Sequence, residues 1–329
     1  MQNRSRCGFV EAASRQKEGK DEMIISASRR TDIPACYGQW MMARLRAGEV
    51  LVPNPYNASR ISRVALSPGN VDCIVFWTKN AAPMLPLLDE LDALGYKYYF
   101  EYTVTGYGSA LEPGLPEKER TVDTFLRLSE RLGPEGVDWR FDPVLLTPSI
   151  TPAWQLERFG ALCCALHGAT RRCVFSFADP YPGIRPSIAP LEETQMRLLA
   201  KGFADIAGEY GLPLYTCAEA VELSEYGIRH AACIDSAKVE RIAGYPIRVE
   251  RDPGQRPACG CAASVDIGAY DSCLHGCAYC YANHGRAVDR LAALHDPASP
   301  LLLGRVDPAV DVVREAPAPS YRTGQTSLF

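Results

Sequence analysis

The alternation of short apolar strands with amphipathic helices is the feature that most constrains the fold of this 329-residue chain. Six segments rich in β-branched and aromatic residues predict strands, at 23–29, 73–79, 97–105, 137–146, 172–179 and 212–219. Five segments predict helices, at 35–48, 82–95, 117–133, 151–168 and 191–211. Because strands that alternate with helices pair in parallel, the sequence predicts an α/β fold, a full or partial (β/α) barrel. A doubly wound open sheet is the alternative, and segments 50–56 and 61–67 predict an inserted hairpin.

Composition divides the chain into four predicted parts. Residues 1–22 are polar, lack the apolar core of a signal peptide and are expected to form a disordered leader. The barrel is expected over 23–245, a cysteine-rich segment packed on it over 246–295, and a mostly irregular, proline-bearing tail over 296–329. The formal net charge of −4 and the absence of an apolar run of about 20 residues predict a cytoplasmic protein with no membrane partner.

Charged residues stand at the ends of the predicted strands, where sites lie in barrels and open α/β sheets. These candidate catalytic residues are Arg30, Asp32, Lys79, Arg140, Asp142 and Glu219. Arginines in such a pocket would hold a carboxylate or phosphate, and carboxylates would orient hydroxyls or amines. The alternative is that Arg140 with Asp142, or Arg30 with Asp32, forms a buried ion pair that only fixes the barrel.

Three cysteines crowd one short segment of a chain that has thirteen. Cys273, Cys277 and Cys280 follow the spacing C-x3-C-x2-C, and clustered cysteines in a reducing compartment indicate metal binding or catalysis. Three thiolates on one loop can cap three irons of a 4Fe–4S cubane and leave the fourth iron open to a small molecule. Zinc is the alternative, with His275 or Cys261 as the fourth ligand.

A second group of cysteines lies apart in the sequence. If the barrel closes, Cys217, Cys233, Cys259 and Cys261 could complete a second metal site, either an auxiliary cluster or structural zinc. They could instead be buried thiols, or Cys261 could complete the first cluster. The scattered cysteines are expected to be small buried hydrophobes: Cys7, Cys36, Cys73, Cys163, Cys164 and Cys173.

The cysteine segment resembles the radical S-adenosylmethionine (SAM) signature, C-x3-C-x-aromatic-C. The fuller string through Tyr281 resembles the spore photoproduct lyase-like branch. The whole chain also resembles a bacterial family of unknown function whose C-terminal cysteines have been likened to the radical SAM cluster. The matching stretches cover most of residues 23–284 and are IISASRRTDIP, VDCIVFWTKN, WRFDPVLL, TCAE, CID and SVDIGAYDSCLHGCAYCYAN.

The radical SAM resemblance implies a partial α/β barrel with a 4Fe–4S cluster on Cys273, Cys277 and Cys280. It implies that SAM binds the open iron and that an electron donor such as a flavodoxin or ferredoxin triggers its cleavage to a deoxyadenosyl radical. Tyr279 would then pack against the cluster or the bound adenine. Two features depart from this pattern: the motif follows the last predicted strand, and no glycine-glycine-glutamate segment is recognisable, so Glu219 is the candidate substitute.

The expected function is therefore an iron–sulfur enzyme of radical SAM type whose substrate is unknown, with nucleic acid as one candidate. The alternative is a non-catalytic zinc or iron–sulfur protein whose tail docks on a partner. Residues 325–329, QTSLF, resemble the short peptide that binds bacterial sliding clamps. Leu328 and Phe329 would supply the apolar anchor of that interaction.

Overall fold

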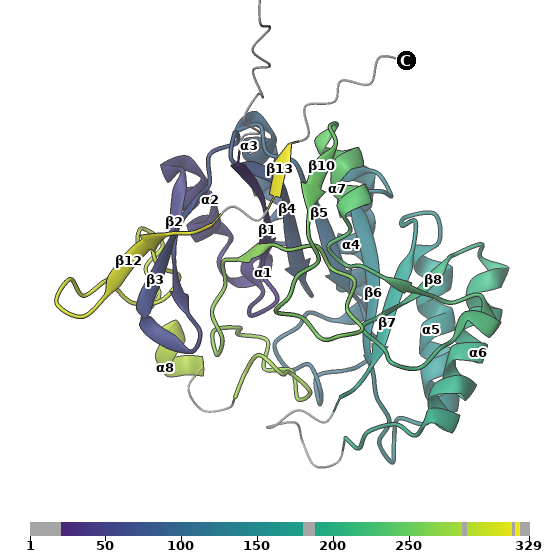
Figure 1. Cartoon of the computed structure of the whole chain (residues 1–329). Coiled ribbons are helices and arrows are strands. Elements are labelled where there is room, and N and C mark those ends of the chain that lie inside the picture. The colour runs from purple at the N-terminus through teal and green to yellow at the C-terminus, as the bar shows by residue number, and fades with distance from the viewer. Residues whose placement is uncertain (1–20, 180–187, 285–287, 318–319, 323–329) are drawn as a thin grey trace, which may run out of the picture.

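The computed structural model describes residues 21–179, 188–284, 288–317 and 320–322. The large sheet contains β1 (Asp21–Ala27), β4 (Val71–Thr78), β5 (Tyr98–Thr103), β6 (Val137–Val144), β7 (Cys173–Phe177), β8 (Leu214–Cys217), β9 (Arg229–Ala231), β10 (Ile247–Val249), β11 (Val265–Asp266) and β13 (Ser320–Arg322). The strand order is β10-β13-β1-β4-β5-β6-β7-β8-β9, and β11 pairs with β1. The pairs from β1 through β9 and the β1–β11 pair are parallel, whereas β13 is antiparallel to β1 and β10 (Figure 1).

A smaller sheet stands beside the large one and contains β2 (Glu49–Asn54), β3 (Asn57–Ala65) and β12 (Val312–Glu315) (Figure 1). Strands β2 and β3 are antiparallel neighbours, which confirms the predicted hairpin. The helices are α1 (Ile33–Cys36), α2 (Gly38–Ala47), η1 (Leu85–Leu87), α3 (Leu88–Ala93), α4 (Lys118–Leu132), α5 (Pro152–Leu166), α6 (Glu193–Glu209), η2 (Ser224–Tyr226), α7 (Ser236–Ala243) and α8 (Val288–Ala292). All six predicted strands and all five predicted helical segments therefore have counterparts.

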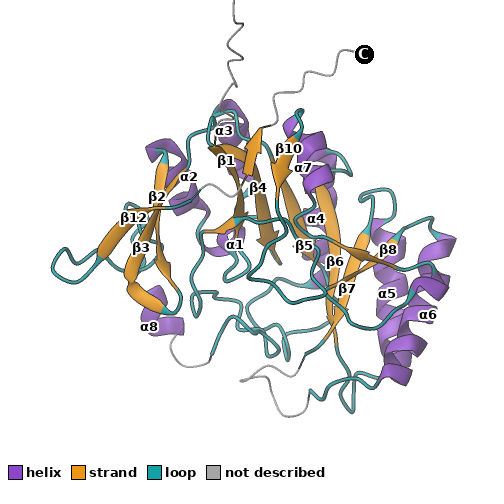
Figure 2. Cartoon of the chain, in the orientation of Figure 1, coloured by secondary structure: helices purple, strands orange, loops and turns teal. Residues whose placement is uncertain are grey.

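Alternate residues of the central strands form the main apolar core against the outer helices. The Trp139 ring of β6 stacks on Phe159 of α5 at 5.3 Å, and Phe175 of β7 contacts Phe203 of α6 at 5.6 Å. Figure 2 shows α5 and α6 packed together beside this part of the sheet. Because successive side chains of a strand point to opposite faces, the residues between these aromatic side chains must face the other side of the sheet.

The opposite face of the sheet is polar although it is buried. Glu101 of β5 and Arg140 of β6 are 0% and 5% exposed. Helix α7 covers part of this face, where the Lys238 ammonium lies 4.3 Å from the centre of the Tyr99 ring. Charged groups buried in this way require partners, so this face holds most of the buried ion pairs of the parallel strands.

The two ends of the parallel sheet approach each other without a strand pair between them in the described part of the chain. Ala262, just before β11, donates a backbone hydrogen bond of 2.9 Å to Ile234, which follows β9. The predicted α/β class with a parallel sheet is thus confirmed. Closure into a barrel is not shown, because β9 and β11 each pair on one side only.

Three predictions about the ends of the chain fall partly outside the described residues. The predicted leader is described only from Asp21, where β1 begins, and the clamp-binding peptide 325–329 lies wholly outside. The predicted tail supplies β12 to the small sheet and β13 to the large one, so it contains more regular structure than expected. Among the described helices, none combines the length and apolarity needed to span a bilayer.

Candidate functional site

A cavity of about 380 Å³ lies at the carboxyl ends of the parallel strands. Figure 1 shows the chain between β10 and α8 running past these ends. Most of the predicted site residues line this one cavity: Arg30, Asp32, Lys79, Arg140, Asp142, Tyr279, Cys217, Cys233, Cys259, Cys261, Cys273, Cys277 and Cys280. Glu219 does not line it. Its carboxylate accepts a 2.9 Å hydrogen bond from the Phe177 amide, and burial raises its pKa to about 7.

Backbone contacts fix the loop that carries Cys273, Cys277 and Cys280. The Gly114 amide donates to the His275 carbonyl at 2.9 Å, and the Ala278 amide donates to the Leu111 carbonyl at 2.8 Å. A Cβ atom at Gly114 would come within 2.7 Å of the His275 Cα, so only glycine permits this approach. The loop is therefore held by the segment that follows β5, and its position depends on the fold rather than on the cysteines alone.

Asp32 connects this loop to α1 and to the end of β4. One carboxylate oxygen caps α1 by accepting from the Ala35 amide at 2.9 Å. The other accepts from the Lys79 amide at 2.7 Å and from His275 Nε2 at 2.8 Å. Arg30 does not pair with Asp32; its Nε lies 3.9 Å from Asp266. Asp32 thus positions the cysteine loop instead of forming the ion pair considered as an alternative.

A second carboxylate, Glu112, anchors the same loop and was not predicted from the sequence. It lies 3.1 Å from the Lys79 ammonium and accepts hydrogen bonds from Lys118 and from the Tyr279 hydroxyl. Burial alone would raise the pKa of Glu112, but the two lysines outweigh it and lower the pKa to about 2. Lys79 also lies 5.3 Å from the centre of the Tyr279 ring. Lys79 and Tyr279, both predicted site residues, therefore already have partners in this network at the edge of the cavity.

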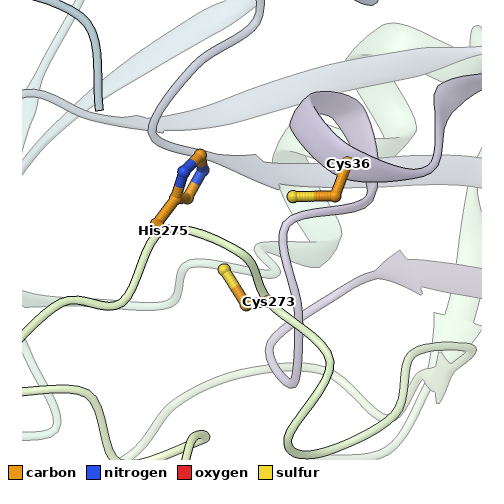
Figure 3. Close-up of side chains that lie close together, drawn as sticks. All are labelled: Cys36, Cys273 and His275. Carbon is orange, nitrogen blue, oxygen red and sulfur yellow. The ribbon is translucent and has the colours of Figure 1, made fainter. Parts of the chain in front are cut away.

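A different group of potential metal ligands appears in Figure 3, formed by Cys36, Cys273 and His275. Their ligand atoms all lie within 4.8 Å of one another. Cys36 was predicted to be a buried thiol, but it is half-buried and contacts Cys273. The sequence signal for Cys36 was its position on α1, four residues after the predicted site residue Asp32. Both His275 ring nitrogens already have oxygen partners, Asp32 at 2.8 Å and the Gly114 carbonyl at 3.4 Å.

The four remaining predicted cysteines meet at the ends of three strands. Cys217 ends β8, Cys233 follows β9, and Cys259 and Cys261 precede β11. The Cys217 and Cys233 sulfur atoms are 3.3 Å apart, and the Cys261 thiol interacts with both Cys233 and Cys259. The Ile234 amide donates to the Cys261 sulfur at 3.4 Å. The fold therefore brings these four cysteines together, although closure into a barrel, the condition on which this prediction from the sequence depended, is not shown.

Arg140 connects this second group to the polar face of the sheet. Its guanidinium lies 2.7 Å from the Cys233 sulfur, 2.5 Å from Asp142 and 3.3 Å from Glu101. Burial, followed by the nearby Asp138 carboxylate, raises the pKa of Glu101 to about 8. The predicted Arg140–Asp142 ion pair exists, and it also contacts a cysteine that lines the cavity.

Arg29 is a cavity residue that was not among the predicted catalytic residues. It forms an ion pair of 3.3 Å with Asp252 and lies 5.5 Å from the centre of the Trp77 ring, whose indole also contacts Arg140 at 5.3 Å. The Nη2 atom of Arg29 is buried and has no hydrogen-bond partner among the residues that the structure describes. Asp266 was missed too; it accepts from the Arg29 amide at 2.8 Å. Arg29 and Asp266 both belong to the stretches that resemble the bacterial family. That resemblance was the available signal for these two residues.

The fold and the site together define an α/β protein with a parallel sheet and a cysteine-lined cavity at the carboxyl ends of its strands. A family model described as a domain of unknown function, DUF1848, matches residues 24–282, and the chain belongs to that family. This confirms the predicted membership of a family of unknown function. The match carries no radical SAM or spore photoproduct lyase assignment.

Comparisons with individual proteins add little. No curated protein matches the chain. A solved structure described as an alpha-L-fucosidase from Bacteroides thetaiotaomicron VPI-5482 is similar at 9% identity and a TM-score of 0.29, over 84% of this chain and 96% of that one. An amidohydrolase from an environmental sample of the Sargasso sea is similar at 13% identity and a TM-score of 0.33, over 87% of this chain and 63% of that one. Neither likeness bears on function.

Proposed function

We propose that this protein is an iron–sulfur enzyme of the radical SAM type, with a 4Fe–4S cluster on Cys273, Cys277 and Cys280. The observation that carries the proposal is that these three cysteines, which have the spacing C-x3-C-x2-C, line a cavity at the carboxyl ends of parallel strands. Sites of α/β enzymes lie at that edge. The family match shows membership of a family of unknown function and says nothing about this chemistry.

The residues of the loop fit a cluster better than a single ion. The group of three potential ligands within 4.8 Å in the described residues contains Cys273 but neither Cys277 nor Cys280. A cubane suits more widely spaced thiolates, because each binds a different iron, whereas the ligands of a zinc ion surround one point. Burial raises the pKa of Cys277 to about 12 although Lys79 opposes it, so the thiol is protonated until a metal displaces the proton.

The two side chains predicted as a fourth ligand are engaged elsewhere. Both ring nitrogens of His275 have oxygen partners, and Cys261 interacts with Cys233 and Cys259. We propose that the fourth iron carries no protein ligand, and Cys36, which contacts Cys273, is the side chain whose replacement tests this. When bound there, the cluster and SAM would supply a deoxyadenosyl radical after transfer of one electron.

Other residues around the cavity would bind and orient the reactants. The Arg30 guanidinium lines the wall and can hold a carboxylate or phosphate, as predicted. Glu219 was the predicted partner for the amino group of SAM, but it does not line the cavity, and its carboxylate accepts from the Phe177 amide. A cavity of about 380 Å³ is within the usual size of small-molecule pockets. The class of substrate, including nucleic acid, stays a prediction.

The test is reconstitution of the full chain with iron and sulfide under strict anaerobiosis, followed by reduction and addition of SAM. We expect a brown protein, an electron paramagnetic resonance signal that changes when SAM binds, and release of 5′-deoxyadenosine. The Cys280→Ala variant should lose the SAM-dependent signal and the product. Cys164→Ala is the matched control, because Cys164 is exposed on α5, and it should retain both.

Two outcomes would contradict the proposal. One is zinc in place of iron in protein purified without added metal, with no cluster after reconstitution. The other is a reduced cluster on these cysteines whose spectrum is unchanged by SAM and which releases no 5′-deoxyadenosine. The first outcome would favour the zinc alternative, in which the metal ties the cysteine segment to the sheet.

A further inference from the structure

Four cysteines on the side of the cavity nearest β8 and β9 form a group that the proposed catalytic cluster does not use. They are Cys217, Cys233, Cys259 and Cys261, hereafter the quartet. Cys233 and Cys261 are 0% and 2% exposed, so the centre of the quartet is buried. Consecutive members interact in the order 217, 233, 261 and 259. Clustered free cysteines of this kind indicate metal binding or catalysis.

We propose that the quartet binds a second iron–sulfur cluster in which every iron has a cysteine ligand. Each of the four thiols lines the same cavity as the loop that carries Cys273, Cys277 and Cys280. The quartet cluster would therefore lie across the cavity from the catalytic one. Because its four corners are filled, it would not bind SAM.

The charge around the quartet suits an anionic cluster. Four thiolates outweigh the positive charge of a cubane core, so cations beside the sulfurs stabilise it. The Arg140 guanidinium, which also pairs with Asp142, lies 2.7 Å from the Cys233 sulfur. Arg29 pairs with Asp252 and interacts electrostatically with Cys261 and Cys233, and among the described residues its buried Nη2 atom has no hydrogen-bond partner, so this atom can donate to a cluster sulfide.

Backbone donors also point to sulfur at this site. The Ile234 amide donates to the Cys261 sulfur at 3.4 Å, and hydrogen bonds of this kind tune the potential of iron–sulfur clusters. Ala218, directly after Cys217, has a φ of 55°, a left-handed conformation that is rare for residues other than glycine. Backbone strain of this kind persists where the surrounding structure imposes it. Here the strained residue directly follows Cys217, a member of the quartet.

The sulfur atoms of the quartet are not arranged around one point. The one group of three potential ligands within 4.8 Å in the described part of the chain contains no member of the quartet. The quartet therefore forms a chain of sulfur contacts. A zinc ion needs all four sulfurs at about 2.3 Å from a single centre, and a cubane needs each thiolate on a different iron, so the Cys217 and Cys233 sulfurs, 3.3 Å apart, must separate to bind a cubane. Metal analysis of the protein distinguishes zinc from the cluster.

The experiment counts iron and sulfide in the anaerobically reconstituted full chain and records its Mössbauer spectrum. We expect about eight irons per chain, as two cubane clusters require. The double variant Cys217→Ser/Cys261→Ser should retain about half of that iron and still show the spectral change with SAM. The variant Cys277→Ser/Cys280→Ser should retain the other half and show no response to SAM. Cys163→Ser/Cys164→Ser is the matched control and should keep all of the iron.

The outcomes separate this proposal from the proposed function. About four irons in the wild type, unchanged in the quartet variant, would overturn the second cluster and leave the first intact. One zinc per chain that is lost only in the quartet variant would also overturn it, as would a Cys217–Cys233 disulfide in protein kept anaerobic. If the quartet variant fails to fold, the single variant Cys259→Ser decides, because Cys259 is at the edge of the group; full iron content there would contradict the proposal.

Discussion

The two cysteine groups face one cavity but are built in opposite ways. Cys273, Cys277 and Cys280 lie within eight residues of one loop, and carboxylates fix that loop, through Asp32 on His275 and Glu112 on Tyr279. The quartet comes from three separate strand ends, and arginines face it. The difference indicates that the loop group is a local motif placed on the sheet, whereas the quartet exists only when the sheet is assembled.

This contrast also predicts different sensitivities. A change that loosens the loop should affect one cluster and leave the body of the sheet folded. A change to the charges behind the quartet should affect the sheet itself, because Arg140, Glu101 and Asp142 belong to its strands. If the two groups behave independently, each change should affect only one of them.

Replacement of Arg140 by methionine should have the largest effect. It would leave the half-buried Asp142 and the buried Glu101 carboxyls without their shared guanidinium and would remove the cation beside Cys233. We expect the free energy of unfolding to fall by about 3 to 5 kcal/mol, the range for breaking a buried ion pair from one side. Denaturant unfolding of the metal-free protein measures this change.

The control for Arg140 is Arg131→Met. Arg131 forms ion pairs with Asp89 and Asp92, but the group is on the surface, so the loss should be under about 1 kcal/mol. Arg140→Met should also lower the iron content of the quartet while the response to SAM persists in the folded fraction. Equal losses in the two variants would show that Arg140 is not an integral part of the sheet.

Glu112→Gln tests the charge that anchors the loop group, and its effect depends on pH. The folded-state pKa of Glu112 is lowered from 4.5 to about 2, so the carboxylate stabilises the fold at pH values above 4.5, and this contribution is lost as the pH falls through about 2. A shift of this size corresponds to about 3 kcal/mol. The difference in unfolding free energy between wild type and variant should therefore shrink from about 3 kcal/mol at neutral pH towards zero in acid.

Glu130→Gln is the control for this pH dependence, because Glu130 is exposed on α4. Its unfolding free energy should follow the wild type at every pH. A Glu112→Gln variant that also runs parallel to the wild type across the acid range would contradict the assigned network. The metal-free protein is used for both, so that acid-driven loss of a cluster does not enter the comparison.

Asp32→Asn should have a smaller effect. Asparagine has one acceptor oxygen; if this oxygen caps α1, the NH2 group, which only donates, leaves the Lys79 amide and His275 without an acceptor. Leaving one such donor unsatisfied costs about 1 to 3 kcal/mol. We expect the loop cluster to be lost several times faster in air. The decay of its visible absorbance measures this rate. Asp235→Asn, at the cap of α7 on the quartet side, should change this rate little.

The local patterns of the sequence were sufficient for most of the fold. The strand and helix segments up to residue 219 were predicted because their periodicity is internal to each segment. Strands β9, β10 and β11 were missed, since two or three residues carry no periodicity and are extended only through their neighbours. The predicted helix 35–48 is divided at Tyr37, whose hydroxyl donates to the Ser272 carbonyl at 2.5 Å, a contact that only the tertiary structure supplies.

The site shows the same limit. Two signals identified the groups that face the cavity. One was the spacing of the cysteines, and the other was the tendency of sites to lie at the carboxyl ends of parallel strands. Glu112, Arg29 and Cys36 were missed because their roles depend on partners far away in the sequence. Glu112 contacts Tyr279, which lies 167 positions later. Glu219 was placed on the wall because it ends a strand segment, but it does not line the cavity, and its carboxylate accepts from the Phe177 amide.

Cys36→Ala should have the smallest effect, and it decides what Cys273 does. If Cys36, Cys273 and His275 held one metal ion, the variant would lose that metal entirely. If Cys273 serves the cluster with Cys277 and Cys280, the variant should keep its iron and its response to SAM. The second result is expected, because both His275 ring nitrogens already contact oxygen atoms, Asp32 at 2.8 Å and the Gly114 carbonyl at 3.4 Å, and a metal would have to displace one of these contacts. Loss of iron in Cys36→Ala, with none in Cys280→Ala, would reassign the site to a mononuclear metal centre.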